Sequence, residues 1–274
     1  MEWPKLKNIV ILILLLANLF LLVMVVTQEH GAVQYQEQAL TNTISVLERN
    51  GIQIDRGQIP SELELSPMTV EREQESEDDL AAALLGSCSV SDLGSGRYAY
   101  QSARGSAEFR SNGSFWFTFA DGVQSVEADG GEESHAVATL EAIGFDGTVI
   151  AREDAGGRVT LTLYQIWQDV PVYSCQAVLE YENGCLRSIV GQRLMGTPQA
   201  SSDRSELISV PTALLRVLSG INDLGDICNE ITSMEPGYLL TTTAETTRLI
   251  PIWYVTTDTG AYSLNALTGA LERA

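Results

Sequence analysis

The feature that most constrains this chain is an uninterrupted apolar run near its N-terminus. Residues 9–26 read IVILILLLANLFLLVMVV, eighteen positions without a charged side chain. At about 1.5 Å per helical residue, this run and its flanks just span a hydrocarbon core of about 30 Å. A cleaved signal peptide is the competing interpretation, but its apolar region is about 7–15 residues long, and no A-x-A cleavage pattern lies between Val23 and Gln28. We therefore predict an uncleaved transmembrane helix over residues 9–26.

The charges that flank this run predict its orientation. Lys5 and Lys7 precede it, whereas Glu29 follows it and the next basic residue is Arg49. Because positive charge is enriched on the cytoplasmic side, residues 1–8 are predicted to be a cytoplasmic tail, too short to bind a cytosolic ligand alone. Everything from Thr27 onward is then extracytoplasmic. We expect a single-pass protein of the cell membrane whose C-terminal region lies outside.

One amide interrupts the apolar run. An amide in the middle of a membrane is costly and usually turns toward another helix. Two interpretations stay open: Asn18 pairs with a partner helix, or a very apolar helix simply tolerates it. At helical spacing, Asn18 shares its face with five apolar residues, and the candidate partner-helix contact comprises Ile11, Leu14, Asn18, Leu21, Leu22 and Val25.

The charge balance excludes one class of partner. The chain carries 16 Lys and Arg against 36 Asp and Glu, a formal net charge of −20 and a pI near 4.3. The only lysines precede the apolar run. A body so acidic has no basic surface for a phosphate backbone, so we predict no nucleic-acid partner.

Four cysteines lie in the region predicted to be outside, where disulfides are possible. Cys175 and Cys185 flank an Asn183-Gly184 turn, and in a two-residue hairpin Glu182 would face Cys185 while Cys175 would face Gln192. Their sulfurs would then point to opposite faces, which disfavours that disulfide. Two alternatives stay open: a disulfide between Cys88 and Cys228, and buried free thiols.

The segment after the apolar run predicts a second helical stretch and a linker. Residues 32–50 repeat apolar side chains near helical spacing and stop at Gly51, so this helix could continue the anchor outward. A Pro-punctuated stretch follows over residues 51–68. The acidic run from Glu71 to Asp79 favours a solvated face or linker over a calcium site, because it lacks D-x-D-x-D-G spacing. A short helix is predicted over residues 79–85.

A β-meander follows in the pattern of strands and turns. Residues 97–101, 107–110 and 114–120 read as strands separated by turns at Gly105 and at Asn112-Gly113, with a further turn at Asp121-Gly122. Residues 112–114 also match a glycosylation sequon, but the turn explains them better.

The remaining sequence contains a degenerate repeat. Its markers are Val170-Pro171-Val172-Tyr173 and Ile250-Pro251-Ile252-Trp253, whose prolines lie 80 positions apart. Each marker follows a predicted helix, over residues 133–143 or 211–221, and opens a hairpin turned at Asn183-Gly184 or at residues 258–260. Because proline removes a ladder donor, the Pro strands are predicted at sheet edges.

These patterns predict an α+β fold in which a transmembrane helix precedes an extracytoplasmic region of repeated helix plus antiparallel β-meander units. The predicted organisation is a cytoplasmic tail (1–8), a transmembrane helix (9–26), a membrane-proximal helix and acidic linker (27–85), a first α+β unit (86–200) and a second α+β unit (201–274).

The sequence shows no pattern that is typical of catalysis. His30 and His135 are too few and too separated for a histidine-centred site, and both are predicted to be solvated or capping residues. H-E-x-x-H, G-x-S-x-G, Walker and dinucleotide-binding motifs are absent. The aromatic residues Trp116, Trp167, Tyr173, Trp253 and Tyr254 are candidates for a ligand groove but more often form core on strands. We predict no enzyme, no catalytic, cofactor-binding or metal residues, and no cofactor.

Both ends of the chain resemble a known family. The opening MEWPKLKN before an apolar helix with an internal Asn, and the closing PIWYV followed by YSLNALTG, are similar to YycI-type regulatory proteins. The stretch VLERNGI at residues 46–52 also suits that family and its YycH relatives. The resemblance covers the whole chain, although the cysteines and the lysine-free body depart from it. The repeat is also similar to PepSY-like modules.

The resemblance implies an accessory regulator of the WalK (YycG) sensor histidine kinase, acting with a YycH-like protein on a two-component system that governs cell-wall metabolism. It places the kinase contact in the transmembrane helix and implies no catalytic residue. The expected partners are thus the kinase, a YycH-like protein and the lipid bilayer. The alternative is a membrane-anchored PepSY-like binding or protease-inhibitory module, and an acidic wall hydrolase ranks last.

Overall fold

The structure is a computed structural model with a mixed α+β fold and one long open sheet. It describes residues 3–126, 131–201, 206–243 and 246–274, and within them the side chains of residues 3–6, 8–10, 12, 23–34 and 74–76 lie outside the description.

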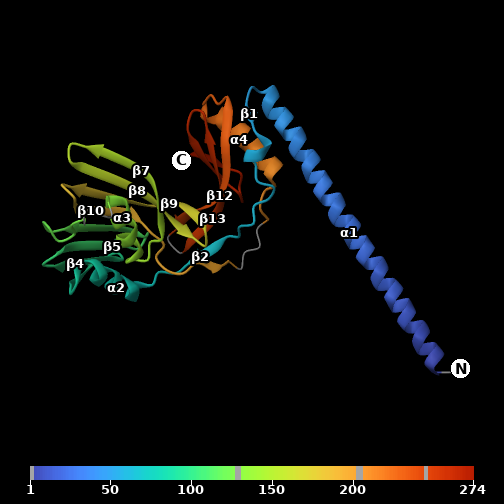
Figure 1. Cartoon of the computed structure of the whole chain (residues 1–274), viewed down its shortest axis with the longest axis horizontal. Coiled ribbons are helices and arrows are strands. Elements are labelled where there is room, and N and C mark those ends of the chain that lie inside the picture. The colour runs from blue at the N-terminus through green and yellow to red at the C-terminus, as the bar shows by residue number, and fades with distance from the viewer. Residues whose placement is uncertain (1–2, 127–130, 202–205, 244–245) are drawn as a thin grey trace.

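The most prominent element is helix α1, Trp3–Arg49, which leaves the body as a rod (Figure 1). Its 47 residues correspond to about 70 Å. The predicted helices over residues 9–26 and 32–50 are therefore one helix. It ends where predicted, because Gly51 adopts φ +85° and its N–H donates to the Glu48 carbonyl at 3.0 Å.

Within the described part of the chain, no helix has both the length and the apolar character needed to span a membrane. The predicted span over residues 9–26 includes positions 9, 10, 12 and 23–26, whose side chains lie outside the description.

The first part of the sheet is antiparallel and carries two helices, α2 (Gln74–Leu85) and α3 (Gly131–Glu141). Its strands are β3 (Ser89–Gly94), β4 (Arg97–Ser102), β5 (Gly105–Arg110), β6 (Ser114–Phe119), β7 (Gly147–Ala155), β8 (Arg158–Trp167), β9 (Val170–Glu182) and β10 (Cys185–Gln192). Alternate residues of β4–β6 and β8–β10 form a core with α2 and α3 that includes Phe115, Phe117, Leu140, Leu161 and Leu163. The predicted meander is confirmed, but the sequence analysis missed β3, whose residues are all exposed.

The second part of the sheet packs on helix α4 (Val210–Leu224) and on the end of α1. Its elements are β1 (Gln53–Ile54), the 3-10 helix η1 (Arg56–Gln58), β2 (Met68–Val70), β11 (Gln199–Ala200), β12 (Glu230–Thr242), β13 (Thr247–Thr257), β14 (Ala261–Asn265) and β15 (Leu271–Arg273). α4 begins after Ser209 and ends at Gly225, which adopts φ +71°. The buried residues Leu40, Leu47, Ile52, Ile59 and Leu63 are thus part of this second core.

Strand β9 joins the two parts. It pairs with β8 and β10 on its way through the first part, and near its start Val172 lies opposite Tyr238 of β12 in a parallel pairing. The Leu240 N–H also donates to Ser174 Oγ at 2.7 Å. A small core under this joint includes Val172, Cys175, Tyr238 and Leu249. One continuous sheet therefore runs through both parts.

The prediction that the Pro strands lie at sheet edges is wrong. β13 lies between β12 on one side and β2 and β14 on the other. Its pairing with β2 ends at Leu249 and its pairing with β14 begins at Ile252, so Pro251 falls where the neighbour changes. Pro171 likewise precedes the pairing of β9 with β12 at Val172. No ladder donor is required at Pro251, where the neighbour changes, or at Pro171, the second residue of β9, which has no partner on the β12 side before Val172.

The Asn183-Gly184 hairpin has the predicted turn but not the full predicted register. Both turn residues have positive φ, and Glu182 faces Cys185. A bulge near Leu186 then shifts the pairing, so the predicted pairing of Cys175 with Gln192 does not occur. All four cysteines, Cys88, Cys175, Cys185 and Cys228, are free thiols.

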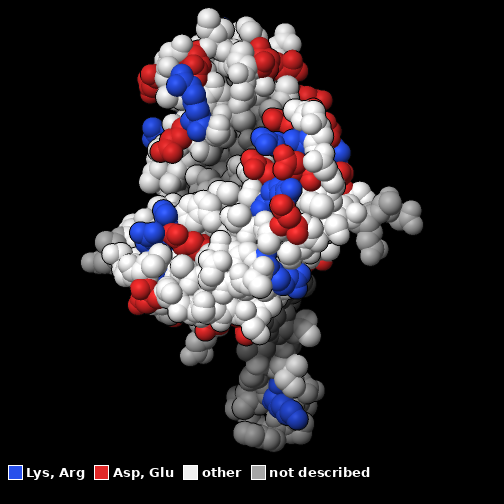
Figure 2. Space-filling model, turned by 90° about the vertical axis from the view of Figure 1, so that its left-hand side faces the viewer, with Lys and Arg blue, Asp and Glu red and all other residues white. Residues whose placement is uncertain are grey.

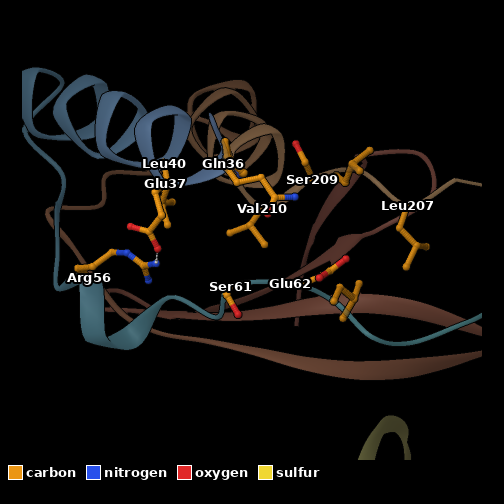
Figure 3. A pocket seen from close by; sticks show the side chains of 12 residues that line it. Gln36, Glu37, Leu40, Arg56, Ser61, Glu62, Leu207, Ser209 and Val210 are labelled. Atoms are coloured by element: carbon orange, nitrogen blue, oxygen red, sulfur yellow. Dashed lines mark hydrogen bonds and ion pairs between the residues drawn. The ribbon is translucent and has the colours of Figure 1, made fainter. Parts of the chain in front are cut away.

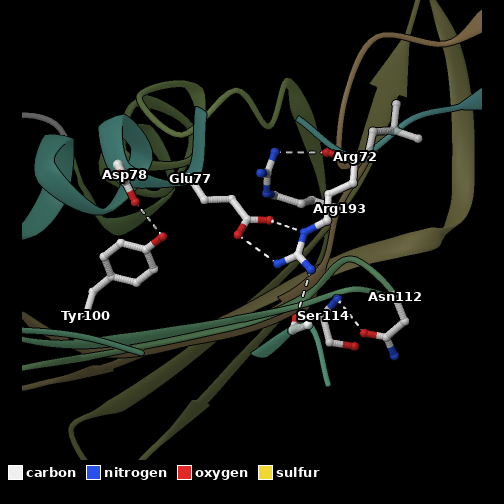
Figure 4. A network of polar contacts seen from close by, with 9 residues as sticks. Arg72, Glu77, Asp78, Tyr100, Asn112, Ser114 and Arg193 are labelled. Carbon is white, nitrogen blue, oxygen red and sulfur yellow. Dashed lines mark hydrogen bonds and ion pairs between the residues drawn. The ribbon is translucent and has the colours of Figure 1, made fainter. Parts of the chain in front are cut away.

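The acidic run is a solvated face at Glu71, Glu73, Asp78 and Asp79, as predicted, but not at Glu77. From position 74 it forms the start of α2, where carboxylates favour the positive end of the helix dipole. The Glu77 side chain is 1% exposed and accepts two hydrogen bonds from Arg72, at 2.9 and 2.8 Å (Figure 4). Arg72 also donates to the Gly96 carbonyl at 2.8 Å. This ion pair ties the segment before α2 to the meander.

Two further groups surround this ion pair (Figure 4). The Tyr100 hydroxyl donates to Asp78 at 2.8 Å, and burial followed by that hydrogen bond raises the pKa of Tyr100. Arg193 is buried over the Phe109 ring and donates to the Leu194 carbonyl at 2.9 Å, and its burial lowers its pKa. Glu77 therefore lies near two arginines.

Elsewhere, charges of both signs share the surface. On the face that Figure 2 shows, basic side chains lie beside acidic ones. The ion pairs that join strands or loops include Arg97 with Glu108 at 3.1 Å and Arg273 with Asp226 at 2.6 Å. Such exposed pairs contribute about 0–1 kcal/mol each. Removing one partner of the buried pair at Glu77 is therefore expected to cost more stability than breaking either of these exposed pairs.

Replacing Glu77 is expected to destabilise the fold strongly. Glu77→Gln leaves Arg72 without its carboxylate in a buried site, so the free energy of unfolding should fall by about 3 kcal/mol or more. Urea unfolding of the full-length chain, followed by tryptophan fluorescence, measures this change. Glu71→Gln removes the same charge from an exposed position and is the control. Equal free energies of unfolding for the two variants would contradict the assignment.

His135 is expected to make the stability of the fold depend on pH. It is not the solvated or capping residue that the sequence suggests. It is half-buried on α3, and its Nδ1 lies 3.1 Å from the Tyr181 hydroxyl. Burial lowers the pKa of His135. The unfolded chain then binds the proton more readily, so the stabilisation is present above pH about 6.5 and is lost as the pH falls below it. His30 lies outside the described side chains.

The measurement is the free energy of unfolding at pH 7.5 and pH 5.5, for the natural chain and for His135→Gln. The natural chain should lose more stability between these pH values than the variant, because only it carries the depressed imidazole pKa. The carboxylates and His30 are common to both proteins and cancel in the comparison. Identical losses would exclude His135 as the source.

Candidate functional site

The last turns of α1 form the strongest candidate for a functional site. Leu40, Thr43 and Leu47 lie at helical spacing and are 4%, 6% and 0% exposed. Thr43 adds no unpaired polar group, because its hydroxyl donates to the Ala39 carbonyl at 2.9 Å. The helix that leaves the body thus ends as a core element.

These residues pack on the second part of the fold. Their cluster includes Leu214 and Val217 of α4 and, on the sheet, the fully buried Trp253 of β13. The periodic Leu40, Ile44 and Leu47 in the predicted helix over residues 32–50 therefore mark its buried face. Val33, which shares that pattern, lies outside the described side chains.

Main-chain hydrogen bonds of the residues that follow α1 also hold the C-terminal end of the helix in place. The Ile52 N–H donates to the Leu47 carbonyl at 3.0 Å, and the Gln53 N–H donates to the Asn229 carbonyl at 2.8 Å. β1 then pairs in parallel with β12, where Gln53 lies opposite Glu230. Movement of α1 about its C-terminal end would thus act directly on α4 and β12.

A pocket of about 510 Å³ lies beside this junction (Figure 3). α1 supplies Gln36, Glu37 and Leu40, and the facing walls come from Arg56, residues 61–63 and residues 207–211. Figure 3 shows Glu37 and Arg56 turned toward each other at one side of it. The volume is within the range of small-molecule sites, about 300–1,000 Å³.

An ion pair between Glu37 and Arg56 joins two walls of the pocket. Arg56 Nη2 lies 3.2 Å from Glu37 Oε1, and Arg56 Nη1 donates to the Ile59 carbonyl at 2.9 Å. The lining contains no His, Cys or Lys. Its other polar side chains include the hydroxyls of Ser61 and Ser209 and the carboxylate of Glu62.

The predicted partner-helix face lies on the free part of α1. Ile11, Leu14, Leu21 and Leu22 are 49–60% exposed. Asn18 is also exposed, and its Nδ2 donates to the Leu14 carbonyl at 2.9 Å, so one amide donor is used within the helix. The Val25 side chain lies outside the described residues. The body of the protein covers none of the five described side chains.

The aromatic candidates divide between core and surface. Trp253 and Tyr173 are buried, as predicted for core residues, whereas Trp116 is partly exposed beneath the Arg110 guanidinium at 4.2 Å. Tyr173 also stacks on Tyr254 at 3.9 Å between ring centroids. Trp167 is partly exposed too.

Within the described residues, no cluster of three or more His, Cys, Asp and Glu has the arrangement of a metal site. The acidic run, whose calcium interpretation the sequence disfavours, instead supplies the ion pair of Glu77.

No protein-family model matches this chain, and no curated protein matches it. Among solved structures, it is similar to an uncharacterized protein from Eubacterium rectale ATCC 33656, with 12% identity and a TM-score of 0.43 over 82% of this chain and 86% of that one. It is also similar to the Bacillus megaterium YpeB C-terminal domain, with 11% identity and a TM-score of 0.39 over 74% of this chain and 98% of that one. Neither likeness assigns a function.

Substitutions on the buried and exposed sides of α1 should differ in their effect on the free energy of unfolding. Leu47→Ala should lower the free energy of unfolding by about 2–5 kcal/mol, because it opens a cavity in the core that α1 shares with α4. Val46→Ala, on the exposed side of the same turn, is the control and should change it by less than about 1 kcal/mol. Both values come from urea unfolding of the full-length chain. Similar values for the two variants would show that α1 does not dock as described.

Proposed function

We propose that this chain is a single-pass membrane regulator of a sensor histidine kinase that controls cell-wall metabolism, acting with a YycH-like protein. In this proposal residues 1–8 are cytoplasmic, residues 9–26 cross the membrane, and the α+β region lies outside. The kinase contact is the α1 face that contains Leu14, Asn18 and Leu21. In this proposal the protein catalyses no reaction, and its outer region senses a signal or tunes the activity of the kinase.

One observation carries the proposal: a single helix contains both the apolar run and a buried core face. α1 is helical from Trp3 to Arg49, with an exposed apolar surface at Ile11–Leu22 and a buried face at Leu40–Leu47. A helix without a break transmits rotation and translation along its axis. A change in the outer region can therefore alter the face that a partner helix meets.

The energies required are modest. To regulate a kinase through the membrane, the helix must bind two states of that protein with different affinity. A coupling of about 1–3 kcal/mol changes the balance of kinase states about 5- to 150-fold. A helix interface with one amide hydrogen bond is sufficient for this.

Insertions between Thr27 and Gln28 test whether α1 transmits its rotation. Two added alanines turn the outer region by about 200° relative to the apolar run, whereas seven added residues turn it by about 700°, which nearly restores the phase. We expect the two-residue insertion to abolish regulation of the kinase and the seven-residue insertion to retain it. Kinase output in cells is the readout.

The same strains provide the control. In-cell cross-linking followed by affinity capture should recover the kinase with both insertion variants, because the apolar run is unchanged. Capture should decrease for Asn18→Leu but not for Ala17→Leu, which alters a neighbouring face. If the kinase is captured by none of these proteins, the proposed partner is wrong. If both insertions regulate normally, the rigid helix is not the route.

A second candidate is a membrane-anchored PepSY-like binding or protease-inhibitory module. It is favoured by the repetition of a helix followed by antiparallel strands and by the pocket beside α1. Replacing residues 1–26 by an unrelated anchor separates the candidates, because regulation through α1 would be lost whereas an outer binding activity would persist.

A further inference from the structure

A second pocket, of about 320 Å³, lies where the two parts of the sheet meet. Strands β7, β8 and β9 supply one wall, and β12 and β13 supply the other. It is separate from the pocket beside α1 and shares no lining residue with it. Three tyrosines and one carboxylate converge on it: Tyr164, Tyr173, Tyr254 and Glu235.

The three tyrosines form a fixed aromatic group. The Tyr173 and Tyr254 rings are nearly parallel at 3.9 Å between centroids, and the Tyr164 ring meets Tyr173 edge-on at 5.1 Å. Burial and, next, a hydrogen bond with Tyr254 raise the pKa of Tyr164 to about 12. The Tyr164 hydroxyl therefore stays protonated, and its ring keeps a neutral, electron-rich face.

The backbone holds this group in place. Glu235 lies directly opposite Tyr254 in the pairing of β12 with β13. The Tyr173 ring occupies the space beside Gly237, where an added Cβ would collide with it. Residues 173–175 of β9 have no partners in β8, because Tyr164 pairs with Gln176 and the next residue of β8, Gln165, pairs with Val172. This irregularity lets Tyr173 reach across from one part of the sheet to the other.

Glu235 gives the pocket its charge. Its side chain is exposed and accepts a hydrogen bond from the Tyr173 hydroxyl at 3.4 Å. No ion pair with an arginine holds it within the described part of the chain. The remaining walls are largely apolar and include Ile150, Ile166 and Pro171. A free carboxylate between aromatic and aliphatic walls suits a cation on an apolar stem.

The edge strand beside the pocket points to a polypeptide as the source of that cation. β7 pairs only with β8 among the described strands, and its Thr148 and Ile150 line the pocket. An extended segment can add to such an edge through main-chain hydrogen bonds and place a side chain in a neighbouring pocket. The net charge of −20 favours a basic segment.

We propose that this pocket binds an arginine side chain of an extended partner polypeptide. The guanidinium pairs with Glu235 and lies against the Tyr254 ring, while its methylene stem packs on Ile166 and Pro171. Arginine fits better than lysine because its planar group both stacks on an aromatic ring and forms paired hydrogen bonds with a carboxylate. The proposal rests on the α+β region and is independent of the kinase and of the membrane anchor.

The test uses the full-length chain in neutral detergent micelles, labelled with 3-fluorotyrosine and observed by ¹⁹F NMR. The probe is Nα-acetyl-arginine N-methylamide, and its citrulline counterpart has the same shape without the charge. At up to about 20 mM probe, a range suited to a weak fragment, the Tyr164, Tyr173 and Tyr254 signals should shift saturably with arginine only. Tyr→Phe variants assign the signals.

Two variants locate the site. Glu235→Gln should weaken arginine binding about tenfold, whereas Glu230→Gln, which removes the same charge from an exposed position of the same strand, should leave it unchanged. Both changes are at exposed positions, and equal melting temperatures confirm folding.

Three outcomes overturn the proposal. The first is no saturable shift, the second is equal shifts with the citrulline probe, and the third is an unchanged affinity in Glu235→Gln. Spermidine and tetramethylammonium test whether the cation comes from a free amine instead of a polypeptide. If either binds more tightly than the arginine probe, the site takes a free amine rather than a polypeptide.

Discussion

The burial of Leu47 and its neighbours against α4 and Trp253 is the contact on which the rest of the arrangement depends. A helix of 47 residues has few means of holding a fixed direction relative to a domain unless its end is part of that domain's core. Here the core includes the helix end, and β1 continues directly into the sheet. The orientation of α1 is therefore a property of the fold, not of a flexible connection.

The same arrangement explains why two pockets occur where they do. Each lies at a seam between elements that are far apart in the chain: α1 with residues 207–211 in one case, and β7–β9 with β12–β13 in the other. Seams leave space because side chains from two layers meet there without interdigitating fully. They are also the places where a small relative movement changes the lining most.

Much of the fold could be predicted from local patterns, and the errors share one cause. The Asn183-Gly184 turn, the stop at Gly51 and the helix near residues 211–221 follow from short-range preferences, and the structure contains them. The burial of Glu77 depends on Arg72 and on the meander, and the interior position of Pro251 depends on which strands flank β13. Local charge or local proline content does not encode such contacts.

The candidate sites also combine features that local spacing predicts with features that depend on contacts between distant residues. The spacing of Leu40, Ile44 and Leu47 marked the docking face of α1, but the pairing of Glu37 with Arg56 crosses a turn that no spacing rule predicts. Tyr173 and Tyr254 were aromatic candidates, whereas Tyr164 and Glu235 became relevant only through contacts among four strands, β8, β9, β12 and β13.

Strand β9 has one more consequence, for how the chain can be divided. Because β9 pairs with β12 at Val172 and Tyr238, and Ser174 accepts from the Leu240 N–H, either half made alone would lose these contacts across the joint. Conversely, a protease that cuts a loop between the halves would leave the fragments associated. The two units of the repeat are therefore joined within one sheet.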